Sequence, residues 1–138
     1  LIEHATVRLT ALDASDPRAF DIRIAGPGAL LVAKLHKLAD RSREPEAKRL
    51  KDKDALDVLR LLRAIPIEEL AASLQRLQHE PFSNEVTREA IEHLHALFGS
   101  VDAPGAVMVV RATEGLEDPR AMAESCVALT DELIRALR

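Results

Sequence analysis

The spacing of apolar residues changes once along this chain, at Gly26-Pro27-Gly28, and that change constrains the fold more than any other feature. Before it, apolar and polar residues alternate over residues 5–12 and again over residues 20–24, the two-residue period of half-buried strands. Turn-forming residues occupy positions 13–17 between these segments. After the change, apolar residues recur at the three- and four-residue spacing of amphipathic helices. The sequence therefore predicts an α+β chain, with an antiparallel strand pair followed by helices.

Five or six helices are expected after the strand pair. Pro27 suits the first turn of a helix that runs to about Arg43, because a proline there removes no helical hydrogen bond. A short helix is favoured over 104–112 because the segment opens with Pro-Gly among helices, although its valines have strand propensity. The other segments predicted are a polar loop over 43–50 and helices over 51–63, 66–81, 84–97 and 119–137.

The length of 138 residues suits a single domain, with residues 1–25 as the strand pair and residues 26–138 as the helical part. Apolar residues make up 47% of the chain, enough for an ordinary core. Two strands alone are marginally stable, so we expect the helices to pack on them or further strands to complete their sheet. Because the chain starts with Leu1 rather than Met, we expect it to be a piece of a longer protein or a processed product.

Composition argues against several classes of function. A net charge of -4 and three aromatic residues, all Phe, do not suit a general nucleic-acid coat or a base-stacking platform. One cysteine excludes an internal disulfide and any metal site built from several thiolates, and it suits a reducing cytosol. No apolar run reaches the roughly 18 residues that span a bilayer. We therefore predict a cytoplasmic protein with no membrane partner.

Two neighbouring predicted helices carry opposite charges on edges that are expected to meet. Lys34, Lys37 and Arg41 follow one edge of the first helix, and Asp54 and Asp57 lie on the apolar side of the second. Because an ionised carboxylate is costly to bury unpaired, we expect the acids to face the bases across an antiparallel helix pair. The cluster is interpreted either as a structural ion-pair network or as a phosphate-binding Lys/Arg cluster oriented by carboxylates.

Residues 25–41, AGPGALLVAKLHKLADR, and residues 51–62, KDKDALDVLRLL, carry a resemblance to a known family. Together they resemble the C-terminal motif region of nucleotidyltransferase-like proteins of the AbiEii/AbiGii toxin family. The shared pattern is a Lys, an Arg about two turns later, and a Lys/Arg-Asp-x-x-Asp-hydrophobic element on the next helix. The resemblance covers residues 25–63, and it implies that the strand pair belongs to a nucleotidyltransferase-type sheet.

The resemblance also implies an activity, the transfer of a nucleotide from a nucleoside triphosphate to an acceptor such as tRNA or another RNA end. It implies Lys34, Asp54 and Asp57 as catalytic residues, and Lys34 and Arg41 as nucleotide-binding residues. Lys37, on the same basic edge, is the third nucleotide-binding residue we expect. A lysine near the triphosphate would neutralise charge as it shifts in the transition state. The implied partners are a nucleoside triphosphate, tRNA, and an antitoxin or a second copy of the chain.

The chain departs from this family at the metal site. The family holds Mg²⁺ with an Asp-x-Asp or Asp-x-Glu on a strand after a Gly-Gly or Gly-Ser turn, whereas Asp21-Ile22-Arg23 places an arginine where the second acid would be. The sequence thus predicts no metal ligands within the chain. The resemblance leaves two alternatives. Either the chain is the C-terminal part of a nucleotidyltransferase-like protein whose Mg²⁺ ligands precede Leu1, or it is a non-catalytic helical interaction module or a degenerate relative of the family.

The other candidate residues are interpreted as structural. Glu89 and His93 are one helical turn apart and supply only two metal ligands, so the histidines are assigned to surface or packing positions. Cys126 lies on the apolar stripe of the last predicted helix, where a buried, unreactive thiol is expected.

Overall fold

A computed structural model describes residues 3–43 and 48–138, and its element order confirms the predicted α+β class. The strands β1 (His4–Thr10) and β2 (Ala19–Ala25) come first. The helices of the described ranges follow: α1 (Pro27–Ser42), α2 (Lys48–Ala64), α3 (Ile67–His79), α4 (Asn84–Phe98), α5 (Pro104–Ala112) and α6 (Pro119–Ala136). None of the helices in these ranges is long and apolar enough to cross a bilayer.

Most predicted boundaries hold, and the differences lie near the start of α2. The segment over 104–112 is helical, as its Pro-Gly opening indicated. The loop expected over 43–50 is shorter than predicted, because residues 48–50 already belong to α2. Residues 44–47 of that loop lie outside the described residues.

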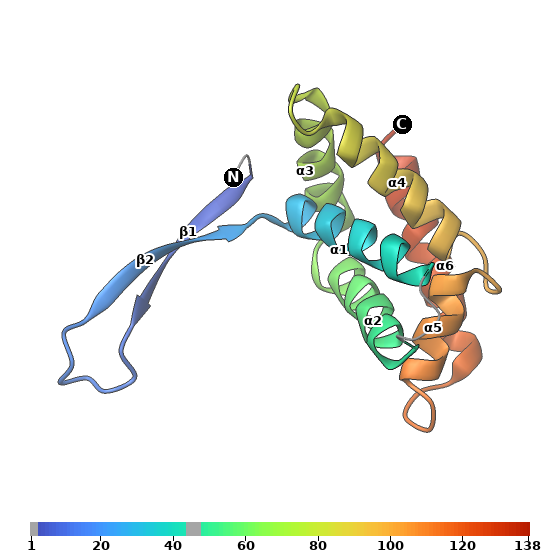
Figure 1. Cartoon of the computed structure of the whole chain (residues 1–138), viewed down its shortest axis with the longest axis horizontal. Helices are drawn as coiled ribbons and strands as arrows, with labels where there is room; N and C mark the ends of the chain where they lie inside the picture. The colour runs from blue at the N-terminus through green and yellow to red at the C-terminus, as the bar shows by residue number, and fades with distance from the viewer. Residues whose placement is uncertain (1–2, 44–47) are drawn as a thin grey trace.

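The helices bury a core around α1. This helix contacts α2, α3 and α4 (Figure 1), and Leu31, Leu35 and Leu38 on its apolar stripe are all buried. Their spacing of four and three residues aligns them on one side of the helix. Phe98, at the end of α4, is the largest fully buried side chain of the described residues.

The strand pair extends away from this core (Figure 1). In the antiparallel pairing, Val7 lies opposite Ile22 and Leu9 opposite Phe20, so these four side chains share one face. That face is open, with Phe20 64% exposed and Leu9 49% exposed. Of the two expected covers for this face, the described helices do not supply one, because their apolar stripes are already buried against one another.

An acidic side chain attaches the base of the hairpin to the helices. Glu3 accepts hydrogen bonds from the backbone N–H of Ala29, at 2.8 Å, and from the hydroxyl of Ser73, and it pairs with Arg76 at 3.2 Å. A carboxylate is favourable at the first turn of α1, where backbone N–H groups lack helical partners. Gly28 allows this close approach, because a Cβ at that position would collide with Ser73.

Candidate phosphate-binding site

The structure brings the five predicted site residues together where α1 meets α2. Lys34 Nζ lies 3.2 Å from the carboxylate of Asp57, and Lys37 Nζ lies 2.8 Å from the carboxylate of Asp54. Arg41 pairs with the other oxygen of Asp54. Residues further along α1 meet residues earlier in α2, so the two helices are antiparallel, as predicted.

The helical spacing and the core beneath it place these side chains. Lys34, Lys37 and Arg41 are three and four residues apart, so they follow one edge of α1. Asp54 and Asp57 are one turn apart on α2, next to the buried side chains that anchor this helix in the core, Ala55, Val58, Leu59 and Leu62. The two charged edges therefore meet because the neighbouring apolar faces pack.

Asp54 is the most enclosed of the five, with 11% of its side chain exposed. Burial by itself raises its pKa, but hydrogen bonds from Lys37 and Arg41 and the charges of those two groups outweigh burial. The pKa of Asp54 is therefore lowered below its usual value, and the carboxylate is ionised at neutral pH. Asp54 holds two cations in fixed positions.

The cluster has more positive than negative charge. Arg60 approaches Asp57 at 3.5 Å, so four cationic side chains face two carboxylates. The Lys37 and Arg60 side chains are 48% and 65% exposed, far more than that of Asp54. Solutes therefore meet Lys37 and Arg60 before they meet Asp54, and this arrangement suits the binding of a polyanion through charge-assisted hydrogen bonds.

A cleft of about 440 Å³ adjoins the cluster, between α2 and α5. Arg60 is a member of the cluster and also lines the cleft. Lys53 and Arg111 are two further basic residues in the lining of the cleft. Arg111 is held there by Asp52, with a guanidinium-to-carboxylate distance of 2.6 Å. The basic surface thus continues from the cluster into the cleft.

Sequence reasoning missed two basic residues of this region. Arg60 was detectable, because it lies three residues after Asp57 and such pairs meet on a helix. Arg111 was not, because it comes 59 residues after its partner Asp52 and meets it only through the packing of α5 on α2.

The residues do not fit a Mg²⁺ site. Within residues 3–43 and 48–138, no group of three or more His, Cys, Asp or Glu side chains is arranged to hold a metal ion. Asp54 and Asp57 face cationic side chains, which compete with a divalent cation for the same oxygens. The cations of the cluster therefore occupy the carboxylate oxygens that a metal ion would need.

The remaining candidates have structural surroundings. Cys126 is buried, and burial raises the pKa of its thiol to about 11, which agrees with an unreactive side chain. His36 contacts His93 edge to face, with ring centres 5.2 Å apart, and its Nε2 lies 2.8 Å from the carbonyl oxygen of Val86.

Comparison of the chain with protein-family models, with curated proteins and with solved structures gives no match. Its function is therefore argued from the geometry and charge of the site.

Proposed function

We propose that the chain is nucleotidyltransferase-like and that its α1–α2 cluster binds the triphosphate of a nucleoside triphosphate. The reaction would transfer a nucleotide to an acceptor such as tRNA. The observation that carries the proposal is the unequal exposure of the cluster: Asp54 is 11% exposed, whereas its partner Lys37 is 48% exposed and Arg60, beside Asp57, is 65% exposed. Fixed cations around a phosphate stabilise charge without reorganising during the reaction.

Each residue of the cluster has a distinct role in this proposal. Lys34 contacts the reacting phosphate, and Lys37 and Arg41 bind the remaining phosphates. Asp54 and Asp57 act as positioning residues, because their oxygens face these cations. The adjoining cleft supports the proposal, since its volume of about 440 Å³ is within the range of ligand sites.

Catalysis of this kind uses Mg²⁺, and we propose that its ligands come from outside this chain. Phosphate binding by the cluster does not depend on them. An antitoxin or a second copy as partner, and a cytoplasmic location, belong to the same proposal.

Nucleotide transfer tests the proposal directly. The full-length gene product is incubated with Mg²⁺, tRNA and each α-³²P-labelled nucleoside triphosphate, alongside its Lys34→Ala and Arg120→Ala variants. Arg120 is the control because it is an exposed cation on α6 whose partner, Glu124, is not a member of the cluster. We expect label transfer by the wild type and Arg120→Ala and a loss of transfer in Lys34→Ala.

The alternative is that the ion pairs only fix helix packing in a non-catalytic helical interaction module. Absence of label transfer, together with unchanged nucleotide binding by Lys34→Ala, would favour this alternative.

A further inference from the structure

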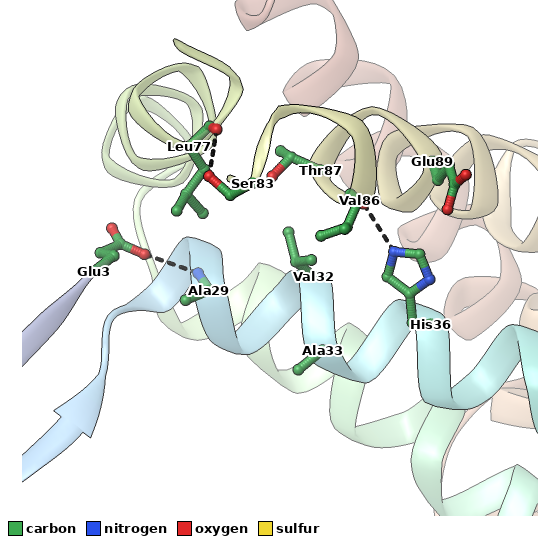
Figure 2. A pocket seen from close by; sticks show the side chains of 10 residues that line it. All are labelled: Glu3, Ala29, Val32, Ala33, His36, Leu77, Ser83, Val86, Thr87 and Glu89. Carbon is green, nitrogen blue, oxygen red and sulfur yellow. Dashed lines mark hydrogen bonds between the residues drawn. The ribbon is translucent and has the colours of Figure 1, made fainter. Parts of the chain in front are cut away.

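A second cavity lies apart from the basic cluster, where α1 meets α4 and the end of α3 (Figure 2). Its volume is about 600 Å³, within the range of small-molecule sites. Its middle is mostly apolar, lined by Ala29, Val32, Ala33, Leu77 and Val86.

An acidic side chain marks each end of this cavity. Figure 2 shows Glu3 at the end near the start of α1 and Glu89 at the other end, beside His36. No Lys or Arg is among the described residues that line it. Glu3 is already paired with Arg76, whereas no salt bridge of the described residues engages Glu89. Of the acidic residues described in this lining, Glu89 is therefore the one whose charge is left to attract a cationic ligand.

Thr87 contributes a hydroxyl that has no partner. The side chain is fully buried, and its Oγ1 makes no hydrogen bond with any described residue. Figure 2 shows it on the side of α4 that faces α1, between the two acidic ends. The neighbouring Ser83 hydroxyl, by contrast, donates to the carbonyl oxygen of Leu77 at 2.7 Å. Buried polar groups are normally paired, so the Thr87 hydroxyl keeps an unused hydrogen-bonding capacity at the wall of the cavity.

We propose that this cavity binds a linear aliphatic diamine or polyamine. The methylene chain lies over Val32 and Ala33, one ammonium group pairs with Glu89, and the other lies near Glu3. An amine or ammonium N–H donates to Thr87 Oγ1. A ligand with an apolar middle and cationic ends matches the cavity, whose apolar middle lies between two acidic ends. Binding of such a ligand does not depend on the proposed phosphate site.

Calorimetric titration with 1,6-diaminohexane and with spermidine tests this proposal. Hexylamine, with one charge, and hexane-1,6-diol, with none, are the matched probes. We expect saturable binding of the diamine and spermidine, weaker binding of hexylamine and no binding of the diol. Absence of saturable binding of both amines, or equal binding of the diol, would overturn the proposal.

Variants then locate the binding site. Glu89→Gln should weaken diamine binding about three- to fivefold, as expected for one exposed ion pair. Glu92→Gln makes the same change of charge on the same helix outside the cavity and should leave binding unchanged. Equal losses in the two variants would indicate nonspecific attraction and contradict the proposal.

Two further variants separate binding from folding. Thr87→Val removes the unpaired hydroxyl at nearly constant volume, so it should weaken diamine binding while the melting temperature of the free protein stays the same or rises. Ala33→Phe fills the cavity and should abolish binding, whereas Ala72→Phe, on an exposed position of α3, should not. Full binding by Ala33→Phe would overturn the proposed location.

Discussion

At the scale of single residues, the α1–α2 cluster depends most on Asp54. This enclosed carboxylate accepts hydrogen bonds from both Lys37 and Arg41, and its removal leaves both cations without their partner. Asp57 is more exposed and pairs with Lys34 and, at a longer distance, with Arg60.

Asp54→Asn should lower the free energy of unfolding by about 2 kcal/mol at pH 7, the order of magnitude for charged hydrogen bonds in a partly buried pair. The pKa of Asp54 is lowered in the folded protein, so its stabilisation is present above the unfolded pKa of about 3.8 and is lost as the pH falls through the folded value. The difference in the free energy of unfolding between the wild type and Asp54→Asn should thus persist to about pH 5 and shrink below pH 3.8.

Urea unfolding at several pH values measures this difference. Asp21→Asn is the control, because Asp21 forms an exposed pair with Arg8 on the hairpin. If Asp54→Asn were as stable as the wild type at pH 7, the hydrogen bonds from Lys37 and Arg41 to Asp54 would not stabilise the fold.

Cys126 gives a second prediction at this scale. Burial raises the pKa of its thiol to about 11, so little thiolate forms at pH 8 and solvent does not reach the sulfur. Modification by a thiol reagent such as DTNB should be slow in the folded protein and fast in urea. Rapid modification of the folded protein, at the rate of free cysteine, would show that the thiol is accessible.

At the scale of elements, α1 connects the parts of the molecule. Its leucine stripe packs in the core, its basic edge meets α2, and a third side borders the cavity beneath α4. Its first turn also receives Glu3 from the hairpin. The position of α1 therefore sets the geometry of both proposed sites.

Gly28→Ala tests the packing at the start of α1. In a helix, Gly→Ala usually stabilises, but here the added Cβ would collide with Ser73, whose hydroxyl accepts the Gly28 N–H at 3.0 Å. We expect a loss of about 1–3 kcal/mol in the free energy of unfolding, as for other overpacked sites, measured by urea denaturation. A gain in stability would show that Gly28, in the first turn of α1, is not packed against Ser73 of α3.

The sequence predicted most elements because each helix has an apolar stripe that it buries in the shared core. It also predicted the ion pairs, since helical spacing fixes which charges share an edge. It did not predict the placement of the hairpin, because alternation shows which face of a strand is apolar and not what covers it. The role of Glu3 was missed for a similar reason, as its partner Ser73 is 70 residues away.

At the scale of the whole molecule, a helical body carries an extended hairpin (Figure 1). The core is built from helix-to-helix contacts, and the apolar face of the hairpin contributes little to it. The stability of the helical body should therefore depend little on that face.

Phe20→Ser and Leu35→Ala should differ sharply in stability. Phe20 is exposed, so its replacement should change the free energy of unfolding by no more than about 0.5 kcal/mol. Leu35 is buried in the core, so Leu35→Ala should cost about 2–5 kcal/mol. Urea unfolding followed by circular dichroism compares them, and a similar loss in both variants would mean that the hairpin face is part of the core.

The most direct test of the proposed phosphate site is calorimetric titration of the protein with inorganic triphosphate, which needs neither an acceptor nor a complete catalytic centre. We predict saturable binding by the wild type that weakens with salt, about tenfold weaker binding by Lys34→Gln, and unchanged binding by Arg120→Gln. No binding by the wild type, or equal binding by all three proteins, would contradict the account.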